Sequence, residues 1–279
     1  MPSSLHADVL VDTLAAPAGP WTQVDVCERV GSTNAVSLAE PVPWRVLVAE
    51  QQDAGRGRHS RAWVSPAGTS VAMSMTVPLP PRPDEWGWIP LVTGLAVKDA
   101  LARVGGEELE VALKWPNDVL VRRAGSDREL RKVCGILCES AGQSVVAGVG
   151  INVSVPEEEL PVPTATSLHL EGLHADDARE QIVIAVAEAF AARFAALSNG
   201  GPYLAGLRRN YHEACSTIGA DVRIHVPGGA ADVTGRAADV DESGRLVVDV
   251  ASGGSLDGGI DRRAFAAGDV VHVRRVQQA

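Results

Sequence analysis

The chain has 279 residues, of which 46% are hydrophobic and 22% are charged, and its formal net charge at pH 7 is −10. This composition excludes a disordered chain and allows one or two folded domains with a sizeable core. The negative charge disfavours a general nucleic-acid binder, which would normally present a basic face.

Taken in chain order, the apolar pattern predicts short strands that alternate with a few helices, after a lead-in at 1–20 with room for one helical turn. Strands are expected at 45–50, 69–77, 109–114, 118–122, 132–140 and 144–153. Helices are expected at 33–40, 89–104, 176–197 and 202–214, the first with Ser32 or Thr33 as its N-cap. Because the strands form hairpins and not βαβ units, the sequence favours an α+β fold, a sheet flanked by helices.

The C-terminal part has a different texture. Short alternating strands are expected at 221–226, 233–240, 245–250 and 269–276, separated by glycine-rich turns. This pattern is typical of a small all-β domain such as a little barrel. The sequence therefore predicts one domain at 1–214 and a second at 215–279.

The sequence also indicates a cellular compartment. The first lysine or arginine is Arg29, and no apolar run reaches the roughly 18 to 20 residues that a membrane span needs. Four cysteines form no CxxC pair, so no metal motif is visible. Cys134 and Cys138 lie on one expected strand about 13 Å apart, too far for a disulfide. We expect a cytoplasmic protein with reduced cysteines and no membrane contact.

A loop at 54–63, AGRGRHSRAW, concentrates positive charge in this acidic chain, with Arg56, Arg58 and Arg61 close to Gly55 and Gly57. It could be a plain solvated loop, a non-specific nucleic-acid contact or a phosphate cradle. Glycines let a backbone wrap around an anion, and guanidinium groups clamp phosphate oxygens in pairs. The GxxxxGK[ST] motif is absent and GVGINV has only two of the three glycines of a dinucleotide site, so a bound nucleotide would need another scheme.

Lysine is rare, which draws attention to the positions that keep it. Of 25 basic residues only Lys98, Lys114 and Lys132 are lysines. Lys114 opens the turn KWPND beside Asn117 and Asp118, and Lys132 opens KVCGILCE. Each motif also has an ordinary interpretation, as a plain turn or as a lysine that protects a strand edge.

The motifs GSTN, EQQDAGRGRHSRAW, KWPND, KVCGILCE and GVGINV, in this order, closely resemble the bacterial biotin–protein ligases. The resemblance covers about residues 25 to 170, and the C-terminal segment fits the SH3-like β-barrel that ends these enzymes. It implies a class II synthetase-like catalytic domain with a mixed sheet. It also implies that ATP, with Mg²⁺, activates biotin to biotinyl-5′-AMP, and that biotin then passes to a lysine of a biotin carboxyl carrier protein domain of acyl-CoA carboxylases.

The resemblance also implies roles for individual residues. The biotin-binding positions are Ser32, Thr33, Asn34, Gln52, Arg56, Gly57, Arg58 and Lys132. The ATP-binding positions are Arg56, Arg58, Arg61, Lys114, Asn117 and Asn152. The catalytic positions are Lys132, Arg58 and Asp118. For Trp63 and Trp115, core packing is the favoured role.

Two features depart from the family pattern. Ser60 stands in the arginine loop where the family commonly has glycine, and a serine restricts φ. Only about 25 residues precede the first motif, too few for the DNA-binding domain that some members carry, so we expect no DNA binding. The alternatives are a lipoate or octanoate ligase, a non-catalytic binder of a cofactor or nucleotide, and a nucleic-acid-binding protein.

Overall fold

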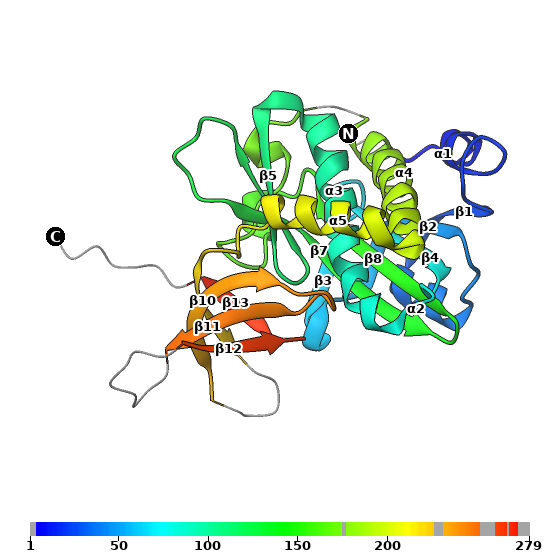
Figure 1. Cartoon of the computed structure of the whole chain (residues 1–279). Coiled ribbons are helices and arrows are strands. Elements are labelled where there is room, and N and C mark those ends of the chain that lie inside the picture. The colour runs from blue at the N-terminus through cyan, green and yellow to red at the C-terminus, as the bar shows by residue number, and fades with distance from the viewer. Residues whose placement is uncertain (1–3, 175–176, 226–230, 252–259, 267, 273–279) are drawn as a thin grey trace.

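The computed structural model describes residues 4–174, 177–225, 231–251, 260–266 and 268–272. Within these residues the chain forms two sheets, an eight-stranded sheet covered by helices and a five-stranded sheet near the C-terminus (Figure 1). The expected α+β class, a mixed sheet flanked by helices, is confirmed. The domain boundary at 214/215 stays a prediction, although the last helix before the second sheet ends at Ala214.

The large sheet has the order β1-β2-β4-β8-β7-β6-β5, with β3 paired to β2. Its strands are β1 (Gln23–Val30), β2 (Arg45–Arg56), β3 (Ala62–Ser65), β4 (Ser70–Pro78), β5 (Leu109–Lys114), β6 (Asp118–Arg123), β7 (Arg131–Ala141) and β8 (Ser144–Asn152). β1 and β2 are parallel and the other pairs are antiparallel, which makes the sheet mixed.

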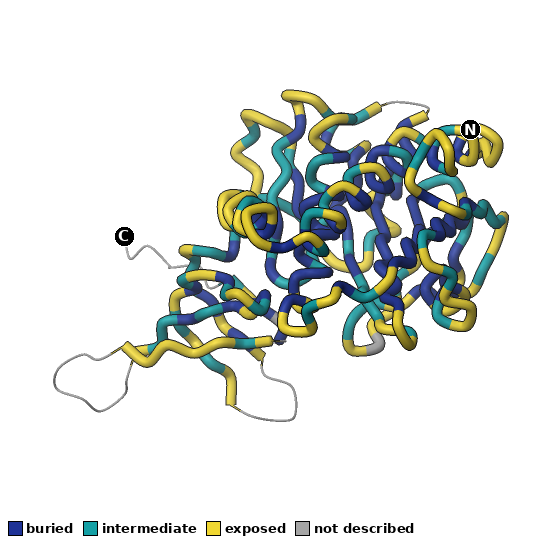
Figure 2. The backbone as a smooth tube through the Cα atoms, turned by 45° about the vertical axis from the view of Figure 1, so that its right-hand side comes forward, coloured by how far each residue is buried: buried dark blue, intermediate teal, exposed yellow. Residues whose placement is uncertain are grey.

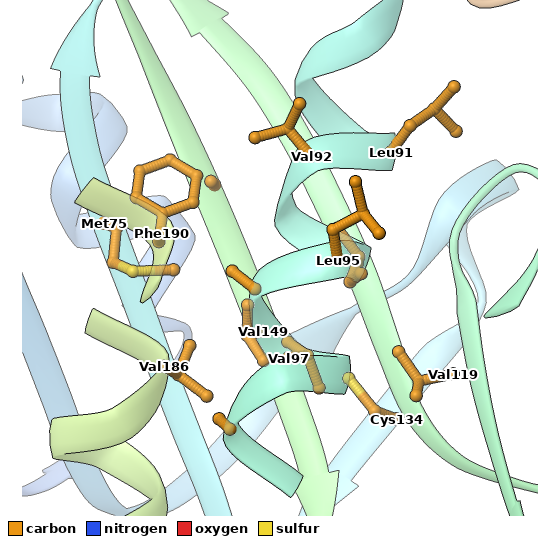
Figure 3. Close-up of a cluster of buried hydrophobic side chains, with 14 of the residues drawn as sticks. Met75, Leu91, Val92, Leu95, Val97, Val119, Cys134, Val149, Val186 and Phe190 are labelled. Carbon is orange, nitrogen blue, oxygen red and sulfur yellow. The ribbon is translucent and has the colours of Figure 1, made fainter. Parts of the chain in front are cut away.

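The α-helices of the described chain are α1 (Ala7–Leu14), α2 (Thr33–Ala39), α3 (Ile89–Gly105), α4 (Ala178–Asn199) and α5 (Gly201–Ala214). α3 and α4 cover one face of this sheet, whereas α2 lies on the other face, where Asn34 lies against Gly148 of β8. Figure 3 shows Leu95 of α3 and Phe190 of α4 packed with Met75 of β4 and Val149 of β8. Each fully buried side chain of this size contributes about 1.5–3 kcal/mol to folding.

By length and composition, α4 is the one helix among the described residues that could cross a membrane. Half of that stretch is buried, and its residues Ile182, Val186 and Phe190 lie in the core. Its apolar surface is therefore used to pack the helix against the rest of the molecule.

The opposite face of the sheet is lined by small residues. On β8, Val145, Ala147, Val149 and Ile151 join the helix-covered core, so alternation places Gly148, Gly150 and Asn152 on the other face. Side chains this small leave room above the sheet, and the cavity described below lies on this side.

The C-terminal sheet has the order β12-β11-β10-β9-β13, and all of its pairs are antiparallel. Its strands are β9 (Asp221–His225), β10 (Val233–Val240), β11 (Leu246–Ala251), β12 (Ile260–Phe265) and β13 (Asp269–His272). Figure 2 shows its outer edge exposed, in contrast to the large sheet. The expected all-β segment is confirmed, while its closure into an SH3-like barrel stays a prediction.

Three strands were not expected from the sequence, namely β1, β3 and β12. β1 carries charged residues on a partly exposed edge, and β3 has only four residues, so neither shows a clear apolar alternation. Of the residues expected to continue helix α4 and strands β9 and β13, Asp176, Val226 and 273–276 lie outside the described residues. The N-cap prediction is confirmed, since the Ser32 side chain accepts a hydrogen bond from the amide of Ala35 at 3.3 Å.

All four cysteines are unpaired, which agrees with the expectation of reduced cysteines. Burial raises the pKa of Cys138 to about 12 and raises that of Cys134 further. Both thiols are therefore protonated at neutral pH and serve as small apolar side chains.

Candidate active site

A cavity of about 700 Å³ lies on the glycine-rich side of the large sheet. All the residues assigned from the resemblance line it, although they come from distant parts of the chain. They are Ser32, Thr33, Asn34, Gln52, Arg56, Gly57, Arg58, Arg61, Lys114, Asn117, Asp118, Lys132 and Asn152. The C-terminal sheet also contributes to the wall, through His225, Gly268, Val270 and Val271. The individual roles of these residues stay predictions.

One end of the cavity is a buried polar wall at the start of α2. The backbone N–H and the hydroxyl of Thr33 both donate to Oε1 of Gln52, at 3.0 and 3.2 Å. Ser32, Thr33 and Gln52 are each less than a tenth exposed. Polar groups held in this way can hydrogen-bond a polar ring with little competition from water.

Asn34 is placed differently from its neighbours, because its amide hydrogens are already used within the protein. Its Nδ2 donates to the carbonyl of Leu137 at 3.0 Å and to Glu139 at 2.9 Å. Its Oδ1 accepts from the hydroxyl of Ser74 at 2.7 Å. Asn34 therefore joins α2 to the sheet, and we expect this residue to support the wall and not to donate to a ligand.

Lys132 and Asp118 form the charged centre of the cavity. Lys132 Nζ lies 2.5 Å from Asp118 Oδ1, with the two side chains 30% and 20% exposed. They begin adjacent antiparallel strands, β7 and β6, so the pair is built on the sheet and not on a loop. The backbone of Lys132 is held by Thr164 and Thr166 at 2.8 Å each. These two bonds fix the backbone at Lys132 and Asp118 holds the ammonium, while the Lys132 side chain lines the cavity.

Trp63 forms the floor of the cavity under this pair. Lys132 Nζ lies 5.6 Å from the centre of the Trp63 ring. Gly135 and Gly150 are opposite each other in the β7–β8 ladder, and a Cβ at either would lie 2.8 or 2.2 Å from the ring. Core packing was the favoured role, yet Trp63 lines the cavity. Glycines inside an expected strand are the signal that could have revealed this contact, because they often mark the close approach of another group.

The arginines of the loop have different partners. Arg56, at the end of β2, lies 3.3 Å from Glu139. Arg58 reaches across the cavity to Oδ1 of Asn117 at 3.4 Å and to the carbonyl of Gly268 at 3.3 Å. His59 adopts a left-handed φ of 55°, so the conformation that favours glycine falls one residue before Ser60.

The KWPND turn is bound to the C-terminal sheet. Trp115 donates its backbone N–H to the hydroxyl of Thr217 at 3.1 Å and its indole N–H to the carbonyl of Gly244 at 3.1 Å. Thr217 is also 3.2 Å from Nε2 of His272, whose pKa is lowered by burial and by the charge of Lys114. Trp115 is 1% exposed, which confirms its packing role. The second sheet therefore holds the turn that carries Lys114 and Asp118.

Asn152 and a metal ion are the remaining groups expected at the nucleotide. Asn152 is buried and donates its amide to the carbonyl of Thr166 at 3.0 Å, which joins the end of β8 to the segment beside Lys132. In the part of the chain that the structure describes, no group of three or more His, Cys, Asp or Glu side chains could hold a metal ion. The Mg²⁺ prediction concerns an ion that enters with ATP, and it stays a prediction.

Comparisons with known proteins agree on one family. A model of the biotin/lipoate A/B protein ligase family matches residues 26–155, and a model of the biotin protein ligase C-terminal domain matches residues 217–273. The biotin–[acetyl-CoA-carboxylase] ligase of Mycobacterium tuberculosis is 41% identical over 272 residues, which cover 95% of this chain and 94% of that protein. The protein of the same name from Paracoccus denitrificans is 34% identical and covers 79% and 91%, respectively.

A solved structure also matches nearly the whole chain. The biotin protein ligase from Aquifex aeolicus, in complex with biotin and ATP, has a TM-score of 0.71 and 25% identity. The match covers 91% of this chain and 100% of that chain, and so includes both sheets. The chain belongs to the biotin/lipoate A/B protein ligase family and carries the C-terminal domain of the biotin protein ligases.

Proposed function

We propose that this protein is a biotin–protein ligase, which activates biotin with ATP to biotinyl-5′-AMP and then transfers biotin to a lysine of an acceptor protein. The observation that carries the proposal is a single cavity that contains three kinds of group. A buried polar wall suits the ring of biotin, and an arginine loop suits phosphates. The third group is the ion pair of Lys132 and Asp118, which lies on the adjacent strands β7 and β6.

In the first step, a carboxylate oxygen of biotin attacks the α-phosphorus of ATP, and pyrophosphate leaves. Two unit negative charges about 4 Å apart repel each other by about 4 kcal/mol at an effective dielectric constant of about 20. Lys132 and Arg58 supply positive charge that offsets this repulsion and the charge that develops on the phosphate oxygens. Arg61, Lys114, Asn117 and Asn152 are the further groups that we assign to the nucleotide.

In the second step, the amine of the acceptor lysine attacks the acyl carbon, and AMP leaves. The attacking amine must lose a proton, and Asp118 is the carboxylate held closest to Lys132. We assign Asp118 the task of orienting the amine or accepting its proton.

The acceptor that we propose is the biotin carboxyl carrier protein domain of an acyl-CoA carboxylase, because the similar proteins are named acetyl-CoA-carboxylase ligases. The unpaired cysteines fit a reducing compartment that also supplies ATP. We therefore place the reaction in the cytoplasm.

The test is ATP–pyrophosphate exchange by the purified protein with Mg²⁺ and either biotin or lipoate. We expect exchange with biotin alone. Exchange with lipoate alone would keep the adenylation chemistry but replace the substrate. No exchange with either, from protein shown to be folded, would overturn the proposal.

Arg58→Ala is expected to let the adenylate escape. Arg58 connects the loop to Asn117 and to the C-terminal sheet, so its loss removes two of the contacts that close the cavity. We expect release of biotinyl-AMP without acceptor to accelerate by about tenfold or more, corresponding to about 1.4 kcal/mol in the barrier. Single-turnover release measures this rate. Arg103→Ala, on the outer surface between α3 and α4, is the control, and release at the wild-type rate from Arg58→Ala would contradict the assignment.

A further inference from the structure

Glu139 is a carboxylate for which the resemblance implied no role. It lies on β7, where alternation places it on the same face as Gly135 and Leu137, facing α2. A single oxygen, Oε2, accepts from Nδ2 of Asn34 at 2.9 Å and from Arg56 at 3.3 Å. One carboxylate thus touches both the polar wall at α2 and the base of the arginine loop.

The contact with Asn34 completes a closed set of hydrogen bonds. Asn34 is 4% exposed, and its amide binds Glu139 and Leu137 of β7 and Ser74 of β4. A Cβ at Gly148 would lie 2.1 Å from Asn34 Oδ1, so the amide also sits directly on β8. Since Thr33 precedes Asn34, these contacts tether the start of α2, which carries the wall that faces the cavity.

The contact with Arg56 acts on the loop. Arg56 is the last residue of β2 and pairs with Ala62 across the strand ladder, so it forms the base from which the loop rises. Its guanidinium lies against Glu139, whereas Arg58 reaches the opposite side of the cavity. The charge of Arg56 is therefore balanced locally, which assigns the two arginines different tasks.

We propose that Glu139 is a positioning residue for the biotin end of the site. Its carboxylate holds α2 through Asn34 and the base of the loop through Arg56, and thereby sets the spacing between the polar wall and the loop. The assignment rests on the proposed function, since it concerns how biotin is received. It also makes Arg56 an anchor of the loop and leaves the phosphates to Arg58 and Arg61.

The predicted effect is on affinity for biotin more than on turnover. Glu139→Gln can still accept from Asn34, but it loses the charge that holds Arg56, and charged hydrogen bonds are about twice as strong as neutral ones. We expect Glu139→Gln to raise the KM for biotin in the exchange assay by about fivefold or more, with kcat changed by less than about twofold. Glu139→Ala loses both contacts and should raise the KM further.

The matched control is Glu110→Gln, which also breaks a glutamate–arginine pair, with Arg122 at 2.7 Å, but on β5 and β6 outside the cavity lining. Arg56→Gln removes the same contact from its other partner, so it tests the proposal by itself if Glu139→Gln fails to fold. If both variants fold, they complete a double-mutant cycle. In the expected result, the two substitutions together raise the KM no more than either alone.

Direct binding of biotin to the protein, measured by calorimetry, separates this idea from the proposed function. Biotin binding by the wild type with unchanged affinity in Glu139→Gln and Arg56→Gln, even with a lowered melting temperature, would show a merely structural role and overturn the proposal. Failure of the wild type to bind biotin would instead overturn the proposed function.

Discussion

Replacing Lys132 by alanine should lower biotin-dependent ATP–pyrophosphate exchange by about 10²- to 10³-fold, the usual cost of removing one preorganised group that stabilises developing charge. Lys132 is the ammonium fixed at the centre of the cavity, 2.5 Å from Asp118 and above the ring of Trp63. Of the other two lysines, Lys114 ends β5 and Lys98 lies on α3. The exchange rate at saturating biotin and ATP measures the effect.

The fold should survive this change, because the backbone of Lys132 is held by Thr164 and Thr166 independently of its side chain. Melting temperature and biotin binding test this directly. Lys98→Ala is the matched control, since Lys98 is the remaining lysine of the chain and lies on α3, on the other side of the sheet. Exchange at the wild-type rate by Lys132→Ala would remove the central assignment.

A second large effect is expected from adding one methyl group to the floor of the cavity. In Gly150→Ala the new Cβ would lie 2.2 Å from Nε1 of Trp63, closer than real Cβ contacts allow, so the indole must move. Trp63 supports Lys132 from below. Because a displacement of about 1 Å at a reacting group can cost about 10²-fold in rate, we expect a loss of that order in exchange activity.

Gly206→Ala is the control for this substitution. It adds the same methyl group in the middle of α5, where nothing lies within 4 Å of the new Cβ. In a helix the change should stabilise the protein by about 0.5–1 kcal/mol and leave exchange unaltered. Full activity of Gly150→Ala would show that exchange does not depend on the contact of Trp63 with Gly135 and Gly150.

The sequence by itself determined the local structure and the chemical types at the site. Apolar periodicity predicted most helices and strands, the N-cap at Ser32, and the change to an all-β segment near residue 215. The motifs, through the family that they resemble, implied the residues that line the cavity. These features depend on neighbours along the chain, on periods of 2 and 3.6 residues, or on motifs that remain readable without coordinates.

Only the tertiary structure decided which side chains meet. Arg58 and Gly268 are 210 positions apart, Trp115 and Gly244 are 129 apart, and Asn34 and Glu139 are 105 apart. Periodicity indicates that a face is buried but not which group covers it, so core packing was the favoured role for Trp63, which lines the cavity. The tasks of Glu139 and of the second sheet follow from contacts between such distant residues, which form only when the sheets and helices pack together.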